Sequence, residues 1–322
     1  MKVVITGAAG FVAPYVARAL RASVPGVVIV GATRSGEAAA EFDDAIAFDL
    51  NDPRSIEAAI EHARPTHVLH LAGVAAPQQA SADPQTAWRV NTLGTLALGR
   101  TLFETVPDAI FLNAGSGAAY GDSAKRFRSL DEEVAFAPAD EYGATKAAAD
   151  LGLGVFARRG LKVVRLRPFN QTGPGQTVEY AIPAFAAQIA AIERGEQEPV
   201  VKVGNLDAER DFCDVADIAK AYALAMIASS EDRIPPGRAY NLCSGRGVVM
   251  RAALDMLLSM SEVRIETQLD PARMRPSDIP RMVGDPARAR AELGWQAMTP
   301  LDETLRAVLE AFRDKSLSSN RP

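Results

Sequence analysis

The first half of the chain alternates short apolar runs with longer segments whose apolar residues recur at helical spacing. The runs are rich in β-branched residues and nearly continuous, as in KVVIT, VVIVGA, HVLHLAG, AIFLNAG and KVVRLRP. Strands of this kind, separated by helices, are typical of a parallel sheet that is buried on both faces. Because crossovers between parallel strands are right-handed, we predict a doubly wound α/β fold for residues 1–168.

The pattern changes after Pro168. FNQTGPGQ predicts a loop, IPAFAAQIAAIERG a helix and PVVKVG a short strand, and later elements alternate irregularly up to a terminal helix near 301–313. We therefore predict a smaller C-terminal lobe over residues 169–315 that mainly binds the substrate and shares some helices and strands with the first domain. The polar residues 316–322 are expected to form a tail.

Composition and charge exclude several classes of function. Hydrophobic residues make up 48% and charged residues 23% of the chain, as in ordinary globular domains. The formal net charge of −5 argues against a general nucleic-acid binder. No apolar run approaches the roughly 20 residues that span a bilayer, and the first predicted strand leaves no room for a signal peptide. We expect a cytoplasmic protein that binds neither nucleic acid nor membrane.

The histidines and cysteines do not form a metal-binding pattern. His62, His67 and His70 fall within one short stretch, whereas Cys213 and Cys243 lie far from it. Neither an HxxxH nor a CxxC motif is present. Two cysteines cannot build a disulfide framework, which favours a reducing compartment. We predict no metal site and assign the histidines to packing around one strand.

A glycine loop follows the first predicted strand. In ITGAAGFVA, Gly7 comes directly after the strand and Gly10 stands where the next helix opens. Gly7 permits a tight turn, and Gly10 lets backbone amides approach a pyrophosphate at the helix N-terminus. A glycine pair alone also fits a plain tight turn. The strand–loop–helix context at the start of a βαβ unit indicates a dinucleotide site.

The choice of dinucleotide depends on the end of the second strand, GATRSGE. An NAD site commonly has an acidic residue there that binds the ribose 2′-hydroxyl. Thr33, Arg34 and Ser35 instead offer two hydroxyls and a guanidinium, which suit a 2′-phosphate. We favour NADP, and Glu37 leaves NAD open. Asp49, after the third strand, is the candidate partner of the adenine amino group.

Three residues suggest redox chemistry at a carbonyl group. NAGSGAAYG delivers Ser116 to the carboxyl edge of the sheet, and Tyr142 and Lys146 stand four residues apart at the start of the next helix. Tyr142 would exchange a proton with a substrate oxygen, which Ser116 would orient. We expect the Lys146 ammonium to lower the pKa of the phenol and to hold ribose hydroxyls. A Tyr–Lys pair of this spacing can also be an ordinary surface pair.

Six motifs together resemble the extended short-chain dehydrogenase/reductases, the NAD-dependent epimerase/dehydratase family, which act on nucleotide sugars with a Rossmann domain. TGAAGFVA, HLAG, VNTLGT, SGAAYG, YGATK and RPFNQTGPGQ occur in the order of that family. The resemblance implies a homodimer built from two helices of each subunit, one of them carrying Tyr142. It also implies that Asn91 lies behind this tyrosine, and that the cofactor is contacted further by Phe11, Val12, Leu50, Leu71, Ala72, Gly73, Asn91 and Pro168.

The second half resembles the GDP-mannose branch of the family, in NQTGPGQ, VKVGNLDAERDFCDV and RMRPSDIPRMVGD. This implies a GDP-sugar substrate. Asn170 would contact its diphosphate, and Arg210 and Arg275 would bind the two phosphates. Two arginines from separate loops can clamp a diphosphate with bidentate hydrogen bonds. By the same resemblance, the base would lie beside Val201, Lys202 and Asn205.

One departure from the dehydratase pattern helps to choose among the reactions of this family. Dehydratases carry an acidic residue at the position of Ala118, and neither Ala118 nor Ala119 can move a proton. RMRPSDIP is most similar to the reductases. We predict NAD(P)H-dependent reduction of the 4-keto group of GDP-4-keto-6-deoxy-D-mannose to GDP-D-rhamnose or GDP-6-deoxy-D-talose. The alternatives are a nucleotide-sugar 4-epimerase with tightly bound NAD, a GDP-mannose 4,6-dehydratase and a non-catalytic cofactor-sensing protein.

Overall fold

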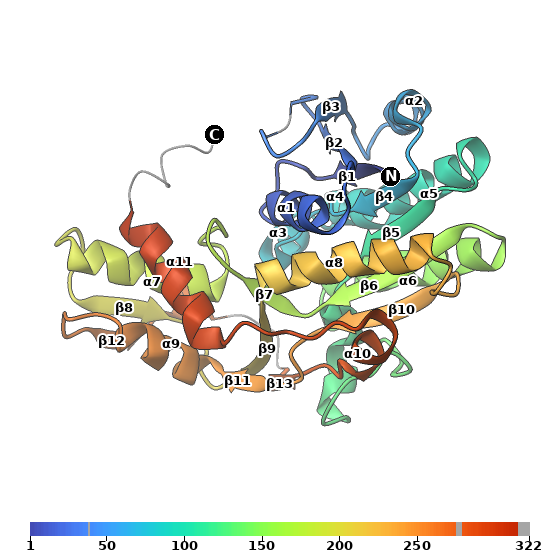
Figure 1. The fold of residues 1–322 in the computed structure, drawn as a ribbon. Coiled ribbons are helices and arrows are strands. Elements are labelled where there is room, and N and C mark those ends of the chain that lie inside the picture. Colours follow the sequence, from blue (N-terminus) through green and yellow to red (C-terminus); the bar gives the residue numbers. More distant parts are fainter. Residues whose placement is uncertain (38, 275–278, 315–322) are drawn as a thin grey trace.

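The apolar runs of the sequence form one parallel sheet in the computed structural model, which describes residues 1–37, 39–274 and 279–314 (Figure 1). The sheet has seven strands in the order β10–β6–β5–β4–β1–β2–β3, and every neighbouring pair is parallel. The predicted doubly wound parallel sheet is confirmed. The strands are β1 (Lys2–Thr6), β2 (Val28–Thr33), β3 (Asp44–Ala47), β4 (His67–His70), β5 (Ile110–Ala114), β6 (Lys162–Pro168) and β10 (Arg238–Leu242).

Helices cover both faces of this sheet, because successive strand residues point to opposite sides and both sides are apolar. Val3 and Ile5 pack with α1 (Ala13–Ser23) and α8 (Val215–Ser230). On the other face, Val4 packs with helices α2, α5 and α6. These helices span Pro53–Ala63, Thr95–Thr105 and Glu141–Arg158 in that order.

A smaller lobe lies beside the sheet and has its own apolar core (Figure 1). Its helices are α7 (Ala181–Glu193), α9 (Met250–Leu258) and α11 (Leu301–Arg313). Its strands are β7 (Asn170–Thr172), β8 (Val200–Val203), β9 (Glu209–Asp214), β11 (Gly247–Val249), β12 (Glu266–Leu269) and β13 (Arg281–Met282). The remaining elements are the α-helices α3 (Pro77–Ala82), α4 (Pro84–Ala87) and α10 (Ala287–Leu293), a π-helical segment (Trp88–Gly94), and 3₁₀ segments (Gly117–Lys125 and Pro271–Arg273).

The two parts of the chain are interleaved. α8 and β10 follow residue 168 in the sequence, yet α8 packs on α1 and β10 pairs with β6 in the large sheet. The FNQTGPGQ segment differs from its predicted loop, because Asn170–Thr172 pairs with β9 and becomes a short parallel strand. Only a tertiary partner makes this strand, since three polar residues carry no strand pattern of their own. The tail predicted for 316–322 lies outside the described residues.

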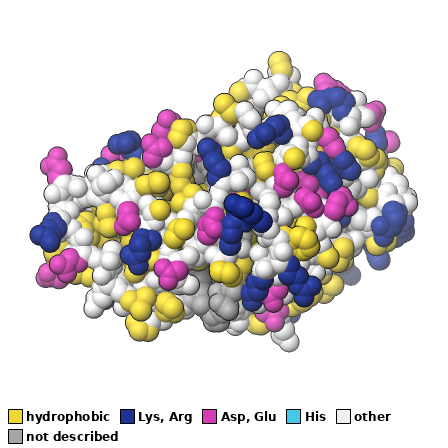
Figure 2. Space-filling view, turned by 90° about the horizontal axis from the view of Figure 1, so that it is seen from below, with side chains coloured by type: hydrophobic (Ala, Val, Ile, Leu, Met, Phe, Trp, Pro, Cys, Tyr) yellow, Lys and Arg dark blue, Asp and Glu magenta, His cyan; other side chains and the backbone are white. Residues whose placement is uncertain are grey.

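The surface and the helices add two observations. On the face that Figure 2 shows, Lys and Arg side chains are interspersed with Asp and Glu side chains. Within the described ranges, no helix is long and apolar enough to cross a membrane.

A buried ionic network joins α6 to the sheet. The Asp150 carboxylate on α6 accepts hydrogen bonds from Arg165 Nη1 at 2.8 Å and from Arg167 Nε and Nη2 at 2.9 Å each. Arg167 Nη1 also donates to the Tyr120 hydroxyl at 2.9 Å, which in turn donates to Asn241 Oδ1 at 2.8 Å. The network therefore fastens α6, β6 and β10 to one another.

We expect Asp150→Asn to reduce the free energy of unfolding by about 3 kcal/mol, because it leaves the buried Arg167 guanidinium without its full counter-charge. Urea denaturation followed by circular dichroism measures the change. The control is Asp122→Asn, which removes only the exposed ion pair with Lys125 and should change stability by less than about 0.5 kcal/mol. Equal stabilities of the two variants would contradict the assigned role of Asp150.

Candidate active site

One large cavity of about 1550 Å³ lies between the carboxyl edge of the main sheet and the lobe. The sheet contributes the residues that follow β1, β4, β5 and β6, and the lobe contributes residues from β7, β9 and α7. Open parallel sheets bind ligands at this edge. The cavity is therefore the candidate active site.

The glycine loop forms a tight cradle at one end of the cavity. Gly7 has a positive φ of 70°, and a Cβ added to it would lie 2.8 Å from the backbone nitrogen of Ala72. A Cβ on Gly73 would lie 2.8 Å from Asn91 Oδ1. No side chain caps the N-terminus of α1, whose first residues line the cavity with Gly10. Free helix N–H groups behind a glycine turn fit the pyrophosphate of a dinucleotide.

The structure places the predicted cofactor residues in two groups. Those that line the cavity are Gly7, Gly10, Phe11, Val12, Leu71, Ala72, Gly73, Tyr142, Lys146 and Pro168. The remaining ones, Thr33, Arg34, Asp49, Leu50 and Asn91, are not part of its lining.

The second group has other roles inside the fold. The Thr33 hydroxyl donates to the Glu37 carbonyl at 2.7 Å and so stabilises its own turn, while Arg34 is exposed at the tip. Asp49 accepts two hydrogen bonds from Asn51, and Leu50 is buried against Gly94. The predicted cofactor contacts of Thr33, Arg34, Asp49 and Leu50 stay predictions.

Asn91 is a supporting residue. Its Oδ1 accepts from the backbone nitrogen of Val74 at 2.8 Å, and its Nδ2 donates to the Val74 carbonyl at 3.0 Å and to Thr145 Oγ1 at 3.1 Å. Asn91 is 1% exposed, so it ties the segment after β4 to α6 from behind. The predicted direct contact of Asn91 with the cofactor stays a prediction.

Ser116, Tyr142 and Lys146 meet in the cavity. Ser116 follows β5, and its hydroxyl accepts from the backbone nitrogen of Ala118 at 3.1 Å and hydrogen-bonds Tyr142. Asp140 caps α6 by accepting from the Gly143 nitrogen at 2.7 Å, which places Tyr142 in the first turn. Lys146 Nζ lies 6.0 Å from the centre of the Tyr142 ring and donates to the Ala114 carbonyl at 3.1 Å.

Burial shifts the pKa values of both Tyr142 and Lys146. Burial raises the pKa of Tyr142 to about 12, against the opposing effect of its hydrogen bond with Ser116. Burial also lowers the pKa of Lys146 to about 8. Burial dominates the pKa of Tyr142 here, and stabilisation of its phenolate by Lys146 together with the nicotinamide stays a prediction. A protonated Tyr142 at neutral pH suits donation of a proton to a carbonyl oxygen.

The predicted substrate residues also divide. Asn170, Asn205 and Arg210 line the cavity. Val201 is fully buried in the core of the lobe, and the backbone of Lys202 is bound on both sides by the Gln188 amide. Neither is part of the cavity lining, and the predicted contacts of Val201 and Lys202 with a base stay predictions. Arg275 lies outside the described residues.

Four further cavity residues escaped the sequence analysis: Trp88, Gln176, Glu179 and Tyr180. Trp88 Nε1 donates to Glu141 Oε2 at 2.9 Å, beside Tyr142. Gln79 Nε2 on α3 donates to Glu179 Oε1 at 2.9 Å and so joins the larger part to the lobe. Gln176 belongs to the NQTGPGQ motif, which was a usable signal, whereas nothing near Tyr180 in the sequence marked it.

His67 and His70 take part in packing, whereas His62 on α2 is exposed. His70 contacts Thr6 Oγ1 at 2.7 Å through Nδ1 and Thr95 Oγ1 at 2.9 Å through Nε2, and burial lowers its pKa to about 3. His67 Nε2 contacts Ser230 Oγ at 2.8 Å. In the part of the chain that the structure describes, no group of three or more His, Cys, Asp and Glu residues is placed to hold a metal ion.

Comparisons with known proteins agree with this geometry. The chain is 34% identical to GDP-6-deoxy-D-mannose reductase of Pseudomonas aeruginosa over 269 residues, which are 83% of this chain and 86% of the relative. It is 27% identical to GDP-6-deoxy-D-talose 4-dehydrogenase of Aggregatibacter actinomycetemcomitans over 297 residues, 91% and 92% of the two chains.

Solved structures match over nearly the whole length. The structure of RMD from Pseudomonas aeruginosa complexed with NADPH has a TM-score of 0.85 at 29% identity, with 98% and 99% of the chains covered. Thermus thermophilus UDP-glucose 4-epimerase in complex with NAD has a TM-score of 0.83 at 28% identity, with 98% and 99% covered. The family model described as GDP-mannose 4,6 dehydratase matches residues 4–308. The chain therefore belongs to the GDP-mannose 4,6-dehydratase family, within the extended short-chain dehydrogenase/reductases.

Proposed function

We propose that this protein uses NADPH to reduce the 4-keto group of GDP-4-keto-6-deoxy-D-mannose, which gives GDP-D-rhamnose (GDP-6-deoxy-D-mannose) or its C4 epimer GDP-6-deoxy-D-talose. The observation that carries the proposal is that Ser116, Tyr142 and Lys146 meet in the cavity. Ala118, which also lines the cavity, has no side chain that could exchange a proton. Relatives named as a GDP-6-deoxy-D-mannose reductase and a GDP-6-deoxy-D-talose 4-dehydrogenase support it.

The residues of the cavity suit reduction of a ketone. The nicotinamide of bound NADPH supplies a hydride. Ser116 and Tyr142 hold the carbonyl oxygen at C4, and Tyr142 transfers its proton to that oxygen as negative charge develops on it. The ammonium of Lys146 stabilises the tyrosinate that this step leaves, and a proton from solvent restores the phenol.

The acidic residues that line the described part of the cavity are all engaged in other hydrogen bonds, which argues against dehydration. These are Asp140, Glu141 and Glu179. Asp140 caps α6, Glu141 accepts from Trp88, and Glu179 accepts from Gln79. Each carboxylate therefore has a structural partner, and elimination of a C6 hydroxyl would need one placed for proton transfer.

The proposal also covers how the GDP-sugar binds and how two subunits would form a homodimer. Asn170 and Arg210 line the cavity on the side of the lobe, where they would bind the diphosphate of the GDP-sugar. The predicted homodimer would use α5 and α6. Leu151 and Val155 are exposed on α6, and Leu93 is exposed just before α5. A cytoplasmic location stays a prediction.

We expect Tyr142→Phe to lower kcat for NADPH oxidation at least about 100-fold, because the proton donor is lost. The substrate, GDP-4-keto-6-deoxy-D-mannose, is made in situ by a dehydratase, and proton NMR of the product gives the C4 configuration. Tyr240→Phe is the matched control, since it removes a buried phenol that donates to Glu292 outside the cavity. Bound NAD that copurifies, together with interconversion of GDP-sugars without NADPH consumption, would instead favour the epimerase.

The rate of reduction should depend on pH through Lys146. With a pKa of about 8, its ammonium is charged below pH 8 and neutral above it, whereas Tyr142 keeps its proton up to about pH 12. We therefore expect kcat/KM to be constant from pH 6 to about 7.5 and to fall above pH 8. A profile that rises between pH 8 and 10 would refute a protonated Lys146 as the active form.

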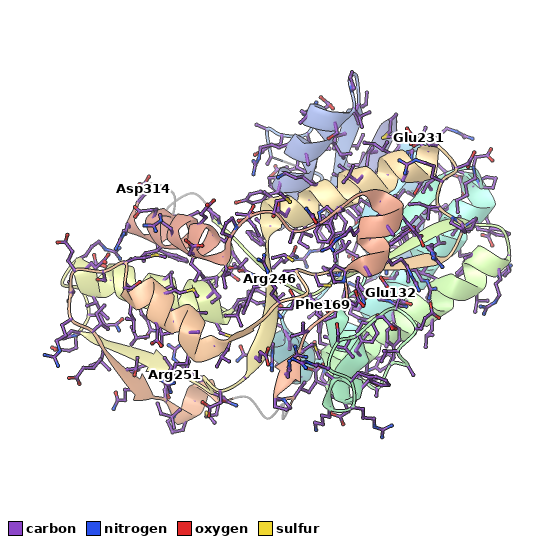
Figure 3. All side chains as sticks on the ribbon, turned by 60° about the horizontal axis from the view of Figure 1, so that its bottom comes forward. Glu132, Phe169, Glu231, Arg246, Arg251 and Asp314 are labelled. Atoms are coloured by element: carbon purple, nitrogen blue, oxygen red, sulfur yellow. The ribbon has the colours of Figure 1, made fainter. Side chains whose placement is uncertain are left out.

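Arg34→Ala tests the preference for NADPH. Removal of a charge-assisted contact with the 2′-phosphate should raise KM for NADPH about 10- to 100-fold and leave KM for NADH unchanged. Arg251→Ala is the control, because Arg251 is exposed on the lobe, far from the tip of β2 (Figures 1 and 3). An equal effect on both coenzymes would remove Arg34 from the cofactor site.

A further inference from the structure

Asp211 is a buried carboxylate outside the catalytic group. It lies in β9 between Arg210 and Phe212, which both line the cavity, yet Asp211 itself has an exposed fraction of 0% and points away from the cavity lining. Burying a carboxylate is costly unless hydrogen bonds compensate for the lost water. Its partners therefore indicate what the side chain does.

Four donors saturate this carboxylate. Oδ1 accepts from the Ser244 nitrogen at 2.8 Å and from the Ser244 hydroxyl at 2.6 Å. Oδ2 accepts from the Gly245 nitrogen at 3.0 Å and from the Gly284 nitrogen at 3.3 Å. Burial raises the pKa of the Asp211 carboxyl, and the hydrogen bonds from Ser244, Gly245 and Gly284 oppose that rise. Such an arrangement is rigid, because each oxygen is fixed by two donors.

The donors come from the strands on both sides of β9. Ser244 and Gly245 lead into β11, which pairs with β9, and Gly284 follows β13, which pairs with β9 at Arg210. Gly284 packs so closely that a Cβ on it would lie 2.6 Å from Cys243 Sγ and 2.7 Å from the Phe169 ring. Figure 3 shows Phe169 and Arg246, neighbours of these segments, where the lobe meets the larger part.

β9 also holds β7, a third segment on the lobe side of the cavity. Asn170 Nδ2 donates to the Asp211 carbonyl at 3.0 Å, and β7 pairs with β9 from Asn170 to Thr172. Asp211 therefore contacts, through its carboxylate or its backbone, the segments that carry Asn170, Arg210 and Met282 into the cavity. All three lie on the face that the lobe contributes, and none carries the catalytic hydroxyls.

We propose that Asp211 is a positioning residue whose carboxylate fixes the nucleoside-diphosphate-binding face of the cavity, because it holds the segment before β11 and the residue after β13 against β9. The inference rests on the proposed function, since it assigns that face to the GDP part of the substrate. Ser116, Tyr142 and Lys146 stand on separate elements, so loss of the Asp211 contacts should affect binding rather than the chemical step.

A matched control exists in α8. Asp217 is 1% exposed and accepts from the backbone nitrogens of Met298 at 2.8 Å and Thr299 at 2.7 Å. It is therefore a second buried carboxylate that fastens a distant segment, but it is absent from the cavity lining. Asp217→Asn should destabilise the fold much as Asp211→Asn does, without changing the diphosphate-binding face.

The experiment compares wild type, Asp211→Asn and Asp217→Asn in three measurements: thermal unfolding, calorimetric titration with GDP, and steady-state kinetics with the keto-sugar. We expect both variants to lose several degrees of melting temperature. Only Asp211→Asn should weaken the Kd for GDP and raise KM for the sugar, by about 10-fold, which corresponds to the loss of one well-placed charged contact. Its kcat and its Kd for NADPH should stay within about 2-fold of wild type, since the chemical step and the glycine loop are untouched.

If Asp211→Asn does not fold, Ser244→Ala removes only one of the four donors and should raise the Kd for GDP about 3-fold. Equal Kd values for GDP in wild type and in the folded variant, or an equal rise in Asp217→Asn, would overturn the positioning role. Wild type that binds GDP without consuming NADPH would overturn the proposed reaction alone. Wild type that binds no GDP would overturn the assignment of this face to the nucleotide.

Discussion

The buried ion pair between Asp150 and Arg167 is the interaction on which the geometry of the active site depends. α6 carries Tyr142 and Lys146 at its N-terminal end, while Asp150 fixes the middle of the same helix to β6. Arg167 directly precedes Pro168, where the sheet ends and the lobe begins. One pair of charges therefore relates the catalytic helix to both the sheet and the substrate side of the cavity.

Burial decides the chemistry at the end of that helix. The phenol and the ammonium are partly buried, so the pKa of Tyr142 rises and that of Lys146 falls. The pair is then better suited to donating a proton to a ketone than to storing a phenolate. Ala118 has no acid/base group at the position where the dehydratases are expected to carry an acidic residue.

The structure uses two other buried carboxylates to join segments that are distant in sequence. Asp211 holds the segments at Ser244 and Gly284 on the lobe side of the cavity, and Asp217 fastens the Met298–Thr299 segment to α8. Backbone N–H groups are the common donors, and they stabilise a carboxylate without a second buried charge. These contacts on the lobe side are separate from the Asp150–Arg167 pair that fastens α6.

Many features of this protein can be predicted from its sequence, because they depend on residues that are close together in the chain. Apolar runs and their spacing predict the parallel sheet, the positive φ of the turn after β1 requires Gly7, and four-residue spacing places Tyr142 beside Lys146 on one helix face. Other features depend on which surfaces meet. The fold buries Val201 in the core of the lobe, joins Asn91 to Thr145 on α6, and directs the Thr33 hydroxyl into its own turn. It also brings Ser244 and Gly284 to Asp211 and partly buries Tyr142. Burial and long-range hydrogen bonds are properties of the packed chain, so only the tertiary structure decided them.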